Sequence, residues 1–276
     1  MKMIRFILGA LLLAASLGAC TSTAKKPALP EDVPDIGHGM IQGYLSMEEQ
    51  LDSKLWEPPA PTEDSPRQML DDAISANTEA LRGTDRWELA ARDADLSFPA
   101  VPEAFSCTLG ISITKEDTPW LYMLLRRTLT DIGLSPYAAK NFYNRERPFM
   151  VKGDGTCTPA DEEGMRSDGS YPSGHTAIGW GWSLILTELQ PDLTDALIAR
   201  GRAFGESRNV CNAHWYSDVV AGRSAGAAAV AKLHSKAEFL EAMDAARTEI
   251  ERARENGLTP TRDCAAEAEA LKKTFF

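Results

Sequence analysis

Apolar residues between positions 71 and 255 recur every three or four places, which is the spacing of one face of an α-helix. Strict alternation of apolar and polar residues, which would indicate strands, is scarce. The clearest apolar stripe consists of Leu121, Leu124, Leu125, Thr128, Leu129 and Ile132. Thr118 and Pro119 are typical of the start of such a helix, and Gly133 is typical of its end. The pattern predicts an all-α fold built as a single domain.

The same periodicity predicts further helices along the chain. They cover residues 71–82, 85–94, 137–147, 175–190, 192–208, 214–234 and 236–255. The segment 175–190 is apolar on nearly all sides, so we expect it to be a central helix. The segment 214–234 is rich in small residues, which allow a neighbouring helix to approach closely. The segment 236–255 is amphipathic and highly charged, as expected of a surface helix.

The first residues are typical of an export signal. Lys2 and Arg5 precede an apolar run, and Leu17–Cys20 resembles the lipid-attachment box of bacterial lipoproteins. We therefore predict a lipoprotein signal peptide at residues 1–19 and acylation of Cys20. An ordinary signal peptide followed by a chance cysteine is the alternative.

Residues 20–40 are polar and rich in proline, which predicts a flexible tether. Residues 41–276 then form the helical domain, with its core at about 70–240. No segment after the signal supplies the roughly 20 apolar residues that a membrane-spanning helix needs. We therefore expect contact with a membrane only through the N-terminal acyl anchor.

Charge and cysteine content narrow the function further. A formal net charge of −11 argues against a nucleic-acid partner, and any anion site must assemble its positive field locally. Export places the chain in an oxidising compartment, where four cysteines allow three disulfide pairings. These cysteines are Cys107, Cys157, Cys211 and Cys264. No C-x-x-C spacing is present, so we predict two disulfides and no metal cofactor.

Lys140 and Arg147 are the first candidate site residues. Seven residues at about 100° each return to nearly the same face of a helix, so both cations can point into one pocket. The alternative is a solvated basic helix face, which the neighbouring Arg145 favours.

The stretch Pro172–His175 is the second candidate. The first N–H groups of a helix point towards anions, Gly174 allows close approach, and Ser173 can cap the helix. His175 can then donate a proton to a departing group. Two alternatives are a Ser173 nucleophile with His175 as its base, and a capped helix with a structural histidine. The first conflicts with geometry, because residues two apart on a helix do not face each other.

His214 and Asp218 are the third candidate. Four residues apart on a helix, the carboxylate can accept one imidazole N–H and leave the other nitrogen free as a nucleophile. Arg208, just upstream, adds a guanidinium fork suited to tetrahedral oxyanions. The alternatives are a surface His–Asp pair or half of a metal site, for which no further ligand set has matching spacing.

Together the three pieces fit phosphoryl transfer without a metal. The transferred group spreads negative charge over three oxygens, so catalysis depends mostly on positioning and charge stabilisation. The pattern K-x6-RP, PSGH and SR-x5-H-x3-D resembles the phosphatidic acid phosphatase type 2 (PAP2) superfamily, and GSYPSGHT resembles its bacterial class A non-specific acid phosphatases. The matching residues are Lys140, Arg147, Pro148, Pro172, Ser173, Gly174, His175, Ser207, Arg208, His214 and Asp218.

The resemblance implies a role for each matching residue. His214 attacks phosphorus to form a phosphohistidine, Asp218 orients it, and His175 protonates the leaving alcohol before activating water. The phosphoryl oxygens are held by Lys140, Arg147, Ser173, Gly174 and Arg208. The family is all-helical, metal-independent and often dimeric, so a homodimer is possible.

The resemblance also implies that Cys157 pairs with Cys211, and with it that Cys107 pairs with Cys264. We thus predict an acid phosphatase of broad specificity on the periplasmic side of the envelope. Thr21 after the acylated cysteine favours an outer-membrane anchor. The alternatives are a lipid phosphate phosphatase, a vanadate-dependent haloperoxidase and a phosphate-binding lipoprotein without catalysis.

Overall fold

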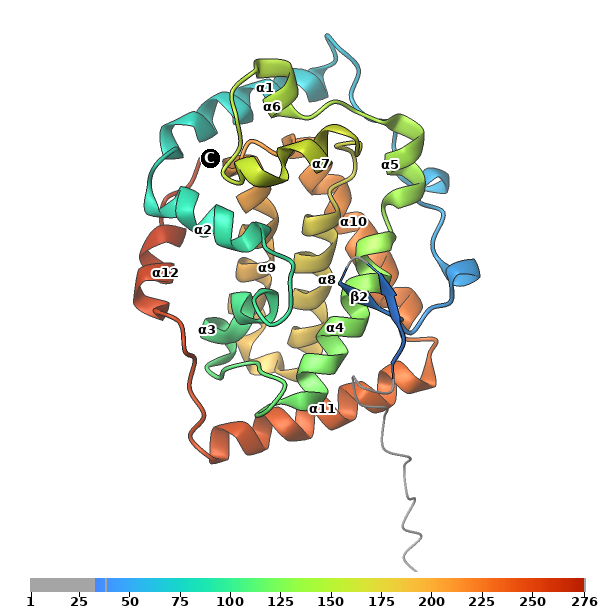
Figure 1. Ribbon diagram of the computed structural model, residues 1–276, viewed down its shortest axis with the longest axis vertical. Helices are drawn as coiled ribbons and strands as arrows, with labels where there is room; N and C mark the ends of the chain where they lie inside the picture. Colours follow the sequence, from blue (N-terminus) through green and yellow to red (C-terminus); the bar gives the residue numbers. More distant parts are fainter. Residues whose placement is uncertain (1–32, 38, 276) are drawn as a thin grey trace, which may run out of the picture.

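The computed structural model of the chain describes residues 33–37 and 39–275 and confirms the all-α fold (Figure 1). Its longer helices are α1 (Pro66–Thr78), α2 (Asp85–Ala94), α4 (Pro119–Leu134), α8 (Gly174–Leu189), α9 (Thr194–Val210), α10 (Tyr216–Leu233), α11 (Ala237–Glu255) and α12 (Cys264–Leu271). Shorter helices are α3 (Ser106–Leu109), α5 (Tyr137–Tyr143), α6 (Pro148–Lys152) and α7 (Glu162–Arg166). The strands β1 (Asp35–Gly37) and β2 (Met40–Ile41) pair antiparallel.

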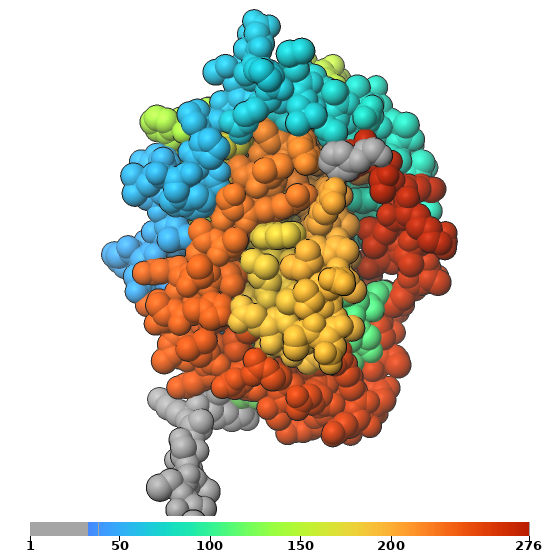
Figure 2. Space-filling model, turned by 180° about the vertical axis from the view of Figure 1, so that it is seen from behind, coloured from blue at the N-terminus to red at the C-terminus, as the bar shows by residue number. Residues whose placement is uncertain are grey.

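Helix α8 is central, as its apolar sequence predicts. It packs against α9, α10 and α4, and Figure 1 shows it enclosed by these helices. The small residues of α10 allow a close approach: a Cβ at Gly226 would lie only 2.4 Å from the carbonyl oxygen of Ala177 on α8. On the opposite face of the molecule, α9 and α10 lie side by side, and α12 lies beyond α9 (Figure 2).

Two predicted helix boundaries near the site are wrong. The helix predicted over 137–147 ends at Tyr143, because Asn144 adopts a left-handed conformation with φ of 42°, which asparagine tolerates better than most residues. Arg147 instead precedes α6. The helix predicted over 214–234 begins at Tyr216, so His214 lies in the turn before α10.

Both disulfides implied by the family resemblance are present. Cys157 pairs with Cys211 at the end of α9, and Cys107 pairs with Cys264 at the start of α12. Disulfides are typical of proteins outside the cytoplasm. Within residues 33–37 and 39–275, no helix is long and apolar enough to cross a membrane. The predicted signal peptide, Cys20 and most of the predicted tether lie outside the described residues, and the domain limits stay predictions.

Candidate active site

A pocket of about 200 Å³ gathers side chains and backbone from α5, α8, α9 and the turns between them. The predicted site residues that line it are Lys140, Arg147, Gly174, His175, Arg208 and His214. Ser173 and Asp218 are fully buried directly behind it, where the backbone N–H of Ser173 donates to the carbonyl oxygen of Asp218 at 3.0 Å. The structure therefore brings all eight predicted catalytic and phosphate-binding residues together, from segments as far apart as residues 140 and 218.

Lys140 and Arg147 meet in the pocket for a different reason from the predicted one. They do not share a helix face, because α5 ends between them. The turn at Asn144 brings Arg147 back, so that Lys140 Nζ and Arg147 Nη2 lie 3.5 and 3.1 Å from the same oxygen, Oδ2 of Asp168. Burial lowers the pKa of Lys140 to about 8, although the charge of Asp168 opposes this shift.

Arg208 supplies the third cation, from the last turn of α9. Its Nη2 lies 3.8 Å from the Met165 sulfur, while its buried Nε and Nη1 have no hydrogen-bond partner among the described residues. Burial, followed by the charge of Arg147, lowers the Arg208 pKa to about 10. Leaving buried donors unpaired costs free energy, and a guanidinium fork of this kind fits two oxygens of a tetrahedral anion.

His214 is oriented through both of its ring nitrogens. Nδ1 lies 3.3 Å from Oδ2 of Asp218, and Nε2 lies 3.0 Å from Nη1 of Arg147. Because a guanidinium can only donate, Nε2 is the acceptor and Nδ1 carries the proton. Burial, followed by the charges of Arg147 and Lys140, holds the His214 pKa well below its usual range. The lowered pKa and the contact with Arg147 both favour a neutral imidazole with its lone pair on Nε2.

Asp218 is held by a buried network that the sequence motifs did not reveal. Its Oδ1 accepts a hydrogen bond from Nη1 of Arg145 at 2.7 Å, while Oδ2 accepts from the Ser170 hydroxyl and, at 2.8 Å, from the backbone N–H of Trp215. Arg145 Nη2 also contacts Asp71 Oδ2 at 2.7 Å. The side chain of Arg145 is only 9% exposed, so the alternative of a solvated basic face is wrong for this residue.

The sequence contained a signal for some of these additional residues but not for others. Ser170 and Asp168 belong to the same Gly/Ser-rich stretch as the second motif, so proximity to that motif could have marked them. Asp71 lies on α1, 74 residues before its partner Arg145, and nothing in its local sequence marks it. Only the packing of α1 against α10 brings it to the site.

The start of α8 has the predicted geometry. Ser173 is the N-cap residue, and its hydroxyl oxygen accepts from the backbone N–H of Thr176 at 3.3 Å. His175 lies in the first turn, where Nε2 donates to the carbonyl oxygen of Ala94 at 3.0 Å. Burial and the charge of Arg208 hold the pKa of His175 well below its usual range. A bound phosphate group, being anionic, would raise that pKa again.

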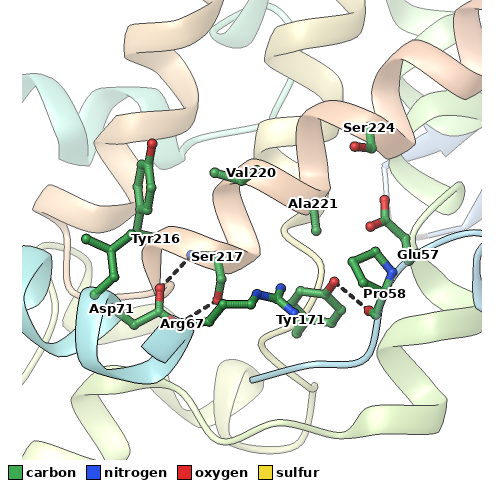
Figure 3. A pocket seen from close by; sticks show the side chains of 11 residues that line it. Glu57, Pro58, Arg67, Asp71, Tyr171, Tyr216, Ser217, Val220, Ala221 and Ser224 are labelled. Carbon is green, nitrogen blue, oxygen red and sulfur yellow. Dashed lines mark hydrogen bonds between the residues drawn. The ribbon is translucent and has the colours of Figure 1, made fainter. Parts of the chain in front are cut away.

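A second cavity, of about 260 Å³, lies between α10, α1 and the segment before α1 (Figure 3). Its walls are mainly apolar, and neither of the two pocket histidines nor any of the three pocket cations lines it. Ser217 and Asp71 border it, and the Ser217 hydroxyl donates to Asp71 at 2.6 Å (Figure 3). This cavity lies behind the network of Asp218 and is not the candidate active site.

In the part of the chain that the structure describes, no group of three His, Cys, Asp or Glu side chains is arranged to hold a metal ion.

Comparison with known proteins agrees with this geometry. A model of the PAP2 superfamily matches residues 120–238. The chain is 44% identical over 213 residues to an acid phosphatase of Zymomonas mobilis subsp. mobilis, and the match covers 76% of this chain and 79% of the relative. It is 40% identical over 239 residues to a non-specific acid phosphatase of Providencia stuartii, with coverage of 84% and 94%. A non-specific acid phosphatase of Salmonella typhimurium is 40% identical over 211 residues, with coverage of 76% and 84%.

Proposed function

The chain belongs to the non-specific acid phosphatases of the PAP2 superfamily, and we propose that it hydrolyses phosphate monoesters without a metal ion through a phosphohistidine on His214. One observation carries the proposal. Two buried nitrogens of Arg208, Nε and Nη1, have no hydrogen-bond partner among the described residues, and Arg208 lines a pocket together with two further cations and His214. Such a pocket is suited to a tetrahedral oxyanion next to a nucleophile.

In the first step, Nε2 of His214 attacks the phosphorus atom. A P–N bond forms as the P–O bond to the leaving group breaks, and the leaving oxygen takes a proton from His175. Asp218 accepts the hydrogen bond from Nδ1 and stabilises the positive charge that develops on the attacking ring.

In the second step, the now neutral His175 takes a proton from water, and the water oxygen attacks the phosphohistidine. The P–N bond breaks, Nε2 of His214 regains its electron pair, and inorganic phosphate is released. His175 returns to its protonated form and is ready for the next ester.

Both steps pass through a phosphoryl group whose charge is spread over its equatorial oxygens. Lys140, Arg147 and Arg208 supply positive charge, and the N-terminus of α8, which favours anions, lines the same pocket at Gly174. These groups are held by the fold before substrate arrives, so little reorganisation is needed during the reaction.

The test is hydrolysis of p-nitrophenyl phosphate in the presence of EDTA between pH 4 and 7. We expect turnover by the wild-type protein and loss of at least about 1,000-fold in kcat for His214→Ala, because the substitution removes the proposed nucleophile. Mass spectrometry of rapidly quenched wild-type enzyme should find covalent phosphate on His214. Full activity of His214→Ala, or phosphate on another residue, would show that the nucleophile is assigned wrongly.

We also propose that Cys20 is acylated and anchors the enzyme to the outer membrane on its periplasmic side. The lipid-attachment box and the two disulfides support export. Incorporation of labelled fatty acid into the wild-type chain but not into Cys20→Ser tests the anchor. Sedimentation tests whether the protein forms a homodimer. A substrate panel identifies the preferred ester.

A further inference from the structure

Asp168 lines the catalytic pocket from the segment between α7 and α8. Its Oδ2 bridges Lys140 Nζ and Arg147 Nη2, at 3.5 and 3.1 Å. The Asp168 side chain is 35% exposed, whereas those of Lys140 and Arg147 are only 2% and 3% exposed. A single partly exposed carboxylate oxygen thus contacts two of the three cations that the proposed function assigns to the phosphoryl group.

The three cations of the pocket therefore differ in whether they already contact a carboxylate. Among the described residues, Arg208 Nε and Nη1 have no partner, whereas Lys140 and Arg147 already contact a carboxylate of the chain. A phosphoryl group that uses all three must take over the contacts of Asp168. The two anions cannot share these contacts without cost, because like charges at contact distance repel strongly.

The two cations do not depend on the Asp168 side chain for their placement. Lys140 Nζ also donates to the carbonyl oxygen of Gly169 at 2.7 Å. Arg147 donates through Nε to the backbone carbonyl oxygen of Asp168 at 3.1 Å and through Nη1 to that of Ala213 at 3.0 Å. These backbone contacts remain when the carboxylate is removed, so its main contribution is its charge.

We propose that the Asp168 carboxylate is an internal competitor of the phosphoryl group and sets the affinity of the pocket for phosphate esters and for inorganic phosphate. This inference rests on the proposed function of the pocket. Substrate displaces the carboxylate from Lys140 and Arg147, and the carboxylate returns to the same two cations as phosphate leaves. Asp168 therefore weakens product binding and favours release, and it forms no bond to the substrate.

The test uses inorganic phosphate as the probe. Its inhibition constant against p-nitrophenyl phosphate and its dissociation constant by calorimetry are measured for wild type, Asp168→Asn and Asp168→Ala. We expect both variants to bind phosphate about tenfold more tightly, equivalent to about 1.4 kcal/mol, with a parallel fall in KM. Glu163→Gln removes one negative charge from an exposed position on the neighbouring α7 and is the matched control. It should leave both constants unchanged.

Phosphate binding that is unchanged or weaker in both variants would overturn the inference, because Asp168 would then serve to hold Lys140 and Arg147 in place. Equal tightening in Glu163→Gln would overturn it as well, since the effect would come from overall charge. Failure of the proposed function gives a different result: the wild-type protein would neither bind phosphate nor hydrolyse the ester. Thermal melting of each variant shows that the measurements concern folded protein.

Discussion

Arg145 offers the sharpest test of how His214, the proposed nucleophile, is oriented. Its guanidinium lies between two buried carboxylates, at 2.7 Å from Asp218 Oδ1 and 2.7 Å from Asp71 Oδ2. Arg145→Met removes the charge and the donors while keeping much of the side-chain volume. Asp71 and Asp218 then face each other without the cation that they share. Removing one partner from a buried ion pair costs about 3–5 kcal/mol, because the charge left behind is uncompensated.

The catalytic effect follows from the position of Asp218. One of its oxygens contacts Arg145 and the other contacts Nδ1 of His214, so a rotation of the carboxylate misplaces the nucleophile. Misplacement by about 1 Å costs on the order of 100-fold in rate. Arg145 does not line the candidate active-site pocket, so KM should change little. We therefore expect kcat to fall about 100-fold at nearly constant KM.

Initial rates with p-nitrophenyl phosphate give the two constants, and urea unfolding gives the loss of stability. Arg145→Lys should recover only part of kcat, because one ammonium cannot serve both carboxylates with the geometry of a guanidinium fork. Arg247→Met, which disrupts a pair between exposed side chains on α11, is the control and should lower stability by no more than about 1 kcal/mol. A destabilised Arg145→Met that keeps wild-type kcat would refute the positioning role and leave Arg145 a structural residue.

Two further predictions concern the pocket charge and the helix packing. Because burial lowers the pKa of Lys140 to about 8 and the proposed phosphate contact needs the protonated form, kcat/KM should be retained below that pH and fall above it. Lys140→Arg should move this loss to higher pH, and a profile identical to wild type would contradict the assignment. Gly226→Ala should destabilise the fold by about 2 kcal/mol or more, because the new Cβ would lie 2.4 Å from the carbonyl oxygen of Ala177. Gly164→Ala, where a Cβ meets nothing within 4 Å, is the control in urea unfolding, and equal loss in both variants would contradict the packing argument.

Local sequence was sufficient to predict most of the helices and the residues of the candidate site. Helix α4 follows from its apolar stripe and from Pro119, and the start of α8 follows from Ser173 as N-cap residue. These features depend on residues within a few positions of each other, where periodicity and capping act directly. The same holds for the eight predicted site residues, because each belongs to a short motif whose chemistry can be recognised without the fold.

Tertiary structure decided how those residues meet and what surrounds them. Lys140 and Arg147 converge through the turn at Asn144 rather than along one helix, and Asp168 comes to lie between them only when the segment before α8 folds over the pocket. Arg145 lies between Asp218 and Asp71 because α1 packs against α10 and brings Asp71 to the site. Contacts of this kind join residues far apart in the chain, and their distances depend on the packing of whole helices. The sequence alone therefore predicted which groups are candidates for the chemistry, and the packed structure determined their geometry and the charges that surround them.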